Sequence, residues 1–132
     1  MARCAAPFRI IMDAVNNQRR FPRVNVDEDH TARFVVGECS VHGILITNLS
    51  AGGCCVKVSS ELGELMGRGT SVSMLVIVHP GIPNVPLQAT VCWLLGQQGR
   101  GSGAFNLVGL EFVNPNPKFQ RTLAEYVEGL LE

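Results

Sequence analysis

Three arginines within five positions are the residues of this chain best suited to bind an anion. Arg19, Arg20 and Arg23 lie in the stretch RRFPR, although the chain of 132 residues is neutral as a whole, with 11 basic and 11 acidic residues. A guanidinium group is planar and permanently charged, binds a phosphate through two donors and stacks on aromatic faces. Acidic residues follow at 27–29, so the stretch fits either a solvated charge cluster or a phosphate site.

A second polar segment, NLSAGG at residues 48–53, separates two apolar stretches. Asn48 offers a hydrogen-bond donor and an acceptor, and the Ser50 hydroxyl can act as either. Gly52 and Gly53 permit positive φ angles and allow a ligand to approach the backbone closely. Because Asn, Ser and Gly are also the usual residues of β-turns, the segment fits an ordinary turn as well as a binding site.

The rest of the composition argues against several other kinds of site. The five cysteines show no CxxC spacing and the three histidines no metal-ligand spacing, so we predict reduced, mostly packed thiols and no metal. Cys54 and Cys55 are expected to face opposite sides of a strand, and Trp93 to lie in the core. No Ser/His/Asp or Cys/His arrangement and no paired carboxylates can be recognised, so we predict that the chain is not an enzyme. A neutral chain with 6% aromatic residues is also a poor candidate for binding nucleic acid.

The hydrophobic pattern beyond residue 30 favours short β-strands. Six segments, 31–36, 43–48, 54–58, 71–78, 85–95 and 104–113, are rich in β-forming residues and separated by turn signals. Strands of this number and spacing predict an all-β fold, a six-stranded antiparallel β-barrel. A C-terminal α-helix follows, with Asn116 as its cap and Pro117 in its first turn. Its apolar stripe is expected to cover an open end of the barrel, or alternatively to dock onto a partner: Phe119, Leu123, Tyr126, Val127 and Leu130.

The N-terminal part is expected to lead into this domain. Residues 1–17 are predicted to be a short lead-in, of which 8–15 fit a short helix, and residues 18–132 to form the domain. Pro22 lacks an amide proton and favours an extended Phe21, so RRFPR is predicted to be a linker rather than a helix. No run approaches the ~20 apolar residues of a membrane span, and Arg9 interrupts the only apolar run near the N-terminus. We therefore expect a cytoplasmic protein without membrane insertion.

Together, the two polar segments resemble the motifs of the PilZ domain, the bacterial receptor module for cyclic di-GMP. RRFPR matches RxxxR, and NLSAGG matches (D/N)xSxxG about 25 residues later. The resemblance covers roughly residues 18–127, because HGILITNLSAGGCCV is similar to the family's second and third strands, ATVCWLLG to its fifth and VGLEFVNPNP to its sixth. The family fold, a six-stranded barrel with a C-terminal helix, agrees with the strand pattern.

The resemblance implies a role for each matching residue. Arg19 and Arg23 would clasp the phosphates and guanines of cyclic di-GMP from the linker, with Arg20 beside them. Asn48 and Ser50 would read a guanine edge from the barrel surface. Gly53, preceded by Gly52, would keep the turn open for the base. Gln18, which precedes the motif, is neutral and leaves open whether one or two ligands bind.

The function implied by this resemblance is that of a cyclic di-GMP receptor. We expect a non-catalytic domain without cofactor or metal, which signals to an unidentified protein partner through ordering of the RxxxR segment. The family's outputs include motility, exopolysaccharide production and pilus function. The alternative is a PilZ-like adaptor that binds no nucleotide and acts in protein–protein interaction, against which the intact motif residues argue.

Overall fold

The computed structural model describes residues 21–98 and 103–131 of the chain. The predicted lead-in 1–17 with its short helix, and the side chains of Arg19 and Arg20, lie outside the described residues.

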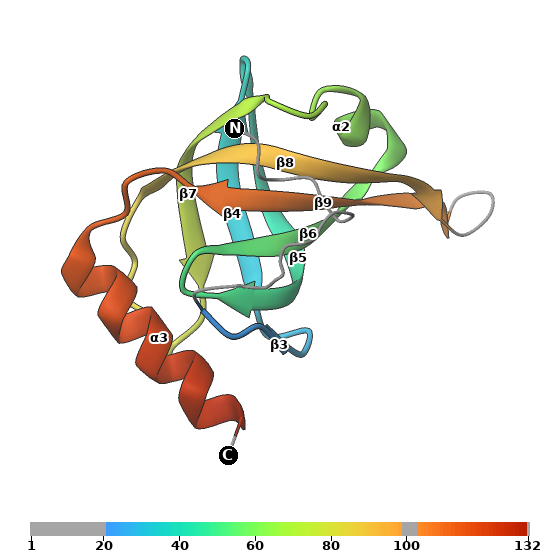
Figure 1. Cartoon of the computed structure of the whole chain (residues 1–132). Coiled ribbons are helices and arrows are strands. Elements are labelled where there is room, and N and C mark those ends of the chain that lie inside the picture. The colour runs from blue at the N-terminus through green and yellow to red at the C-terminus, as the bar shows by residue number, and fades with distance from the viewer. Residues whose placement is uncertain (1–20, 99–102, 132) are drawn as a thin grey trace.

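Six antiparallel strands form a closed barrel (Figure 1). In chain order they are β4 (Thr31–Val36), β5 (Cys39–Ser50), β6 (Gly53–Ser59), β7 (Ser71–Val78), β8 (Leu87–Gln98) and β9 (Phe105–Phe112). The hydrogen-bonded order is β5-β4-β7-β8-β9-β6, and pairing of β6 with β5 closes the ring. The prediction of a six-stranded antiparallel barrel is confirmed. A seventh strand, β3 (Val24–Asn25), adds to the outer edge of β5 and was not predicted.

The strand bounds follow the sequence pattern closely, with one clear exception. β4 and β7 have the predicted bounds, whereas β5 begins at Cys39, four residues before the predicted start. Gly43, at the predicted start, lies inside β5 with a φ of 68°. The strand continues through this glycine, although glycine usually indicates the end of a strand in a sequence. A short helix, α2 (Ser60–Glu64), was also not predicted; Ser59 caps it, accepting a bond from the Leu62 amide at 3.1 Å.

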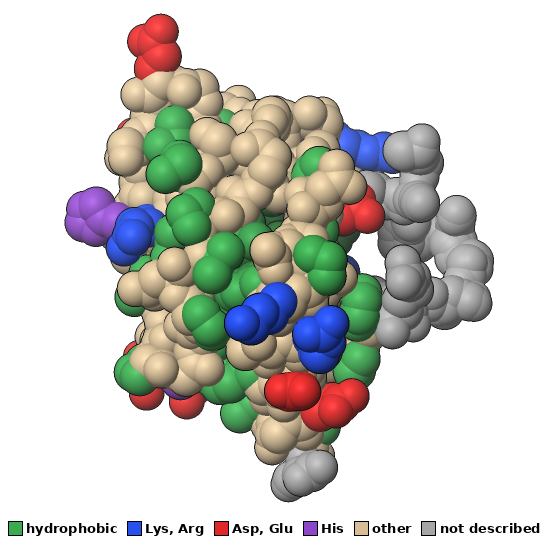
Figure 2. Space-filling view, turned by 90° about the vertical axis from the view of Figure 1, so that its left-hand side faces the viewer, with side chains coloured by type: hydrophobic (Ala, Val, Ile, Leu, Met, Phe, Trp, Pro, Cys, Tyr) green, Lys and Arg blue, Asp and Glu red, His purple; other side chains and the backbone are tan. Residues whose placement is uncertain are grey.

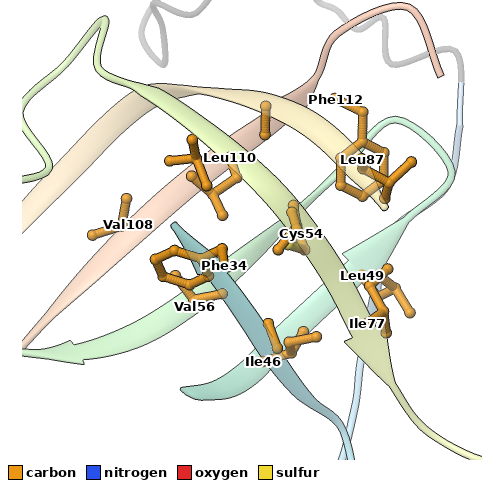
Figure 3. Close-up of a cluster of buried hydrophobic side chains, with 14 of the residues drawn as sticks. Phe34, Ile46, Leu49, Cys54, Val56, Ile77, Leu87, Val108, Leu110 and Phe112 are labelled. Atoms are coloured by element: carbon orange, nitrogen blue, oxygen red, sulfur yellow. The ribbon is translucent and has the colours of Figure 1, made fainter. Parts of the chain in front are cut away.

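The barrel interior is filled by side chains from all six strands (Figure 3). Phe34, Ile46, Leu49, Cys54 and Leu110 are among those that converge there, each nearly or completely buried. Burying one such large apolar side chain contributes roughly 1.5–3 kcal/mol. Trp93 is an exception to the predicted core: it is half-buried and lies against Gly109, where a Cβ atom would come within 2.3 Å of the indole ring. The prediction for Trp93 is therefore wrong, because its ring covers a neighbouring glycine instead of entering the barrel.

The C-terminal helix, α3 (Pro117–Leu131), lies beside the barrel where β5 ends and β6 begins (Figure 1). The Asn116 side-chain oxygen accepts bonds from the Lys118 amide at 2.8 Å and the Phe119 amide at 3.2 Å, so the predicted cap is present. Phe119, Leu123 and Val127 are buried and join the barrel core. Leu130 is 44% exposed, contrary to the predicted stripe, because the last turn of α3 extends beyond the barrel (Figure 1).

A cluster of rings anchors the second half of α3. The Tyr126 hydroxyl lies 2.5 Å from Nε2 of His30, which is buried, and 3.4 Å from Nδ1 of His79. The two imidazoles stack with their centroids 4.1 Å apart. Nδ1 of His79 also accepts a bond from the Gly81 amide at 2.9 Å. The helix is thus bound to the ends of two barrel strands by a specific polar contact as well as by apolar packing.

Candidate ligand-binding site

The polar segment 48–53 forms the tight connection between β5 and β6. In the antiparallel register Ser50 lies opposite Gly53, Leu49 opposite Cys54 and Asn48 opposite Cys55. Leu49 and Cys54 point into the barrel core, so alternation places the Asn48 side chain on the outer face. Asn48 is therefore available at the surface, directly beside the turn.

Ser50 holds this turn together from within. Its side chain is buried, with 4% of the residue exposed, and its hydroxyl accepts a bond from the Gly52 amide at 3.1 Å. The same hydroxyl donates to the Gly53 carbonyl at 3.3 Å. In this arrangement both hydrogen-bonding functions of Ser50 are directed at the turn. Its predicted contact with a guanine edge stays a prediction.

Close approach, and not backbone conformation, requires glycine at position 53, whereas at position 52 space is only tight. A Cβ atom on Gly53 would lie 2.2 Å from the Leu110 carbonyl oxygen on β9, and one on Gly52 would lie 3.3 Å from the Phe21 ring. Neither glycine belongs to the described residues with positive φ, which are Gly37, Gly43 and Gly69 among the glycines. The suggested use of positive φ is therefore wrong. A side chain at Gly53 is excluded instead because the backbone of β9 occupies the space, and one at Gly52 would press against the Phe21 ring.

Two other elements complete the bonding of the turn. The Phe112 amide at the end of β9 donates to the Gly52 carbonyl at 3.0 Å. The Gln120 side-chain amide of α3 donates to the Ala51 carbonyl, also at 3.0 Å. Gln120 was not predicted as a functional residue. It is 69 positions from Ala51, and no sequence pattern relates the two.

Arg23 is brought to the turn by pairing of the short strand that follows it. In β3, Val24 lies opposite Leu49 and Asn25 opposite Asn48. This pairing places Nη1 of Arg23 3.4 Å from Oδ1 of Asn48, across 25 positions of sequence. The last arginine of RRFPR and the first residue of NLSAGG are thus in contact.

The positive charge of Arg23 lowers the pKa values of two cysteines in the neighbouring strand β6. Burial raises the pKa of the Cys54 thiol to about 12, the neighbouring Cys55 acts in the same direction, and Arg23 opposes both. Burial also raises the pKa of Cys55, against a hydrogen bond with Thr47 and the charge of Arg23. Cys55 is buried although it faces away from the core, so both vicinal thiols are protonated at neutral pH and packed.

The structure therefore brings together five of the seven predicted site residues: Arg23, Asn48, Ser50, Gly52 and Gly53. The site consists of a buried, internally bonded turn with a cation and a surface amide at its edge. Such an arrangement can bind an anion at the guanidinium group and orient a polar ring edge at the amide.

A comparison with known protein families identifies the family of this chain. The model of the PilZ domain family matches residues 17–129, which include both polar segments. The chain is a PilZ domain. No curated protein matches it in sequence.

Solved structures share this PilZ fold at low sequence identity. MrkH of K. pneumonia, solved in complex with cyclic di-GMP, is 15% identical with a TM-score of 0.72, over 88% of this chain and 53% of that one. The PilZ domain of YcgR from Escherichia coli, solved with cyclic di-GMP, is 13% identical with a TM-score of 0.68, over 87% of this chain and 92% of that one. The inhibitor of motility MotI/DgrA of Bacillus subtilis is 19% identical with a TM-score of 0.67, over 88% of this chain and 52% of that one. The PilZ domain described here thus spans about half the length of MrkH and of MotI.

The described surface of the PilZ domain that carries α3 is mixed in charge. Figure 2 shows basic and acidic side chains close to one another among hydrophobic ones, and α3 itself contains Lys118, Arg121, Glu125 and Glu128. Within residues 21–98 and 103–131, no group of three or more His, Cys, Asp or Glu side chains could hold a metal ion. In the same ranges, no helix is both long and apolar enough to cross a bilayer.

Proposed function

We propose that this PilZ domain is a non-catalytic receptor for cyclic di-GMP. The observation that carries the proposal is the contact between Arg23 and Asn48 at the edge of the fixed turn. Cyclic di-GMP has two phosphates and two guanines, so its receptor needs a cation and edge-reading polar groups in one place. The complexes of MrkH and of the YcgR domain with this nucleotide add support from the same fold.

Each residue of the site has a chemical role in this proposal. Arg23 binds a phosphate or the O6/N7 edge of a guanine through two guanidinium donors, as arginine commonly does. Asn48 supplies a donor and an acceptor to a guanine edge, and Ser50 with Gly53 shapes the surface against which the base lies. Arg19 and Arg20, four and three positions before Arg23 in the sequence, would supply further guanidinium groups.

Signalling in this proposal comes from the arginine segment. Ordering of a segment on ligand binding changes the surface that a partner protein meets. The partner remains unidentified, and the family's motility, exopolysaccharide and pilus systems are the first places to look for it. Because the chain carries no net charge, we propose no nucleic-acid partner.

Isothermal titration calorimetry with cyclic di-GMP tests the proposal directly. We expect the wild type to bind, and Arg19→Ala and Arg23→Ala to bind tens- to about a hundredfold more weakly, because each loses charge-assisted bonds of about 2–3 kcal/mol. Arg68→Ala removes an exposed arginine between α2 and β7 and serves as the matched control. A wild type that releases no heat at about 100 μM nucleotide would contradict the receptor proposal and favour the adaptor.

The signalling step has its own measurement. Hydrogen exchange of the peptide that covers residues 17–25 is expected to slow when nucleotide is added, because the segment becomes ordered over the ligand. Unchanged exchange in a protein that binds nucleotide would leave the receptor in place and remove this route of signalling.

A further inference from the structure

We infer that Gln120 of α3 is a positioning residue for the nucleotide, because it holds the β5–β6 turn in the form that the site needs. The inference rests on the proposed function and adds a regulatory link to it. Occupancy of the site and docking of α3 are coupled through the bond from the Gln120 side chain to the Ala51 carbonyl.

The Ala51 carbonyl is buried and requires a hydrogen-bond donor from the protein. Ala51 is only 1% exposed, so water has little access to its peptide group. A buried carbonyl without a donor is disfavoured by more than the net contribution of an average hydrogen bond. The Gln120 amide reaches it at 3.0 Å, and the turn between Asn48 and Gly53 is thereby bonded from outside the sheet.

Gln120 lies on a helix, whereas the other groups that bond to the turn lie on barrel strands. Ser50 belongs to β5 and Phe112 to β9, and both strands are parts of the closed barrel. Gln120 belongs to a helix that is joined to the barrel by side-chain contacts. A shift of α3 would therefore release the Ala51 carbonyl while the barrel remains intact.

Docking of α3 is what delivers Gln120 to the turn. Residues three and seven positions further along the helix lie on the same face, and these are Leu123 and Val127, both buried in the core. Further along the helix, the Tyr126 hydroxyl contacts His30 and His79. The position of the Gln120 side chain is consequently set by the packing of the whole helix.

The same helix also contacts the arginine side of the site. α3 packs against β3, the strand that begins immediately after Arg23, as well as against β5. One helix therefore touches the two segments that the nucleotide must bridge. Since coupling of two equilibria is reciprocal, a ligand that requires the fixed turn also stabilises docking of α3.

Gln120→Met tests this inference, because methionine is close to glutamine in size and has no donor. We expect the calorimetric Kd for cyclic di-GMP to rise about three- to tenfold. In the ligand-free variant the Gly52 amide, which bonds to Ser50 inside the turn, is expected to exchange faster than in the wild type. A merely structural role would lower Tm but leave the Kd unchanged at temperatures where the protein is folded.

Gln88→Met is the matched control. It makes the same substitution and removes a side-chain bond of 2.8 Å to Ser71 instead of the bond to the turn. We expect the Kd and the exchange of the Gly52 amide to match those of the wild type.

The outcomes separate this inference from the proposed function. A wild type that binds nucleotide together with a Gln120→Met variant of equal or tighter Kd would overturn the role of Gln120 alone. A wild type that does not bind would overturn the receptor proposal and this inference with it. A weaker Kd with unchanged exchange at Gly52 would also overturn the positioning role, since the turn would not have loosened.

Discussion

The two halves of the site are built in different ways. The turn at Ser50–Gly53 is buried and bonded from three elements: by Ser50 itself, by Phe112 at the end of β9 and by Gln120 of α3. In the arginine segment, Arg23 is only half-buried and its guanidinium group meets Asn48 through a bond of 3.4 Å. One half is fixed before any ligand arrives, and the guanidinium group of the other meets it through a long bond near the surface.

This difference fits the proposed receptor function. A preformed surface loses little conformational entropy on binding, so its contacts contribute to affinity almost undiminished. A loosely attached segment loses more entropy when it is ordered, and for that reason its state depends on the ligand. In the proposed receptor the turn would supply a preformed surface, and the arginine segment would supply charge-assisted bonds together with the ordering that signals. The following four variants test whether the halves differ as described.

Gly53→Ala should have the largest effect, because a Cβ atom at this position would lie 2.2 Å from the Leu110 carbonyl. Either β6 or β9 must move, so we expect a loss of about 3 kcal/mol in the free energy of unfolding. Urea denaturation measures it. Gly96→Ala is the control, since a Cβ there meets nothing within 4 Å. A stable Gly53→Ala protein would show that the turn is less rigid than its contacts indicate.

The buried thiol of Cys54, which follows the turn in β6, should make the free energy of unfolding fall at alkaline pH. Burial raises the pKa of the Cys54 thiol to about 12 in the folded protein, from about 9 in the unfolded chain. The thiol therefore contributes fully to the free energy of unfolding below pH 9, and this contribution is lost as the pH rises towards 12. Between about pH 8 and about pH 10.5 the wild type should therefore lose about 2 kcal/mol more than Cys54→Ala does.

Urea denaturation at the two pH values measures this difference. Cys39→Ala, which removes an exposed thiol, should behave like the wild type. Equal pH slopes for the wild type and Cys54→Ala would mean that water reaches the barrel wall at the turn.

Ser50→Ala should lower the free energy of unfolding by about 1–2 kcal/mol, because the Gly52 amide and the Gly53 carbonyl each lose a buried partner. Thermal and urea unfolding both report it, and Ser40→Ala on the exposed part of β5 is the control. If the two serine variants were equally stable, Ser50 would not be a structural part of the turn and would be free to face the ligand.

Arg23→Met should have the smallest effect on folding, less than about 0.5 kcal/mol, because its bond to Asn48 is long and lies near the surface. The same variant is expected to bind nucleotide poorly, so stability and affinity should separate. A large loss of stability would show that the arginine segment is as firmly built as the turn.

Much of the fold could be predicted from local patterns. Period-two alternation and turn residues located all six barrel strands, and Asn116 with Pro117 located the start of α3. Two features escaped prediction because their signals are too short: β3 has two residues and α2 has five. Leu130 was misassigned because a helical period does not say where the barrel beneath the helix ends.

The candidate site was predicted as a set of residue types and not as a geometry. Arg23 and Asn48 were recognised by their chemistry, and β3 pairing brings them together. The bonds of the Ser50 hydroxyl within the turn were not predicted, and its contact with a guanine edge stays a prediction. Gln120 had no signal at all, since an isolated glutamine on a helix is indistinguishable from a solvated one until the helix is docked.

The sequence by itself determined the strands, the terminal helix and the pair of motifs, because each depends on residues close together along the chain. Closure of the barrel decided that the side chain missing at Gly53 makes room for the Leu110 carbonyl. Docking of α3 decided that Gln120 meets Ala51. These contacts depend on strand register and helix packing, which are properties of the assembled core and are not encoded in any single segment.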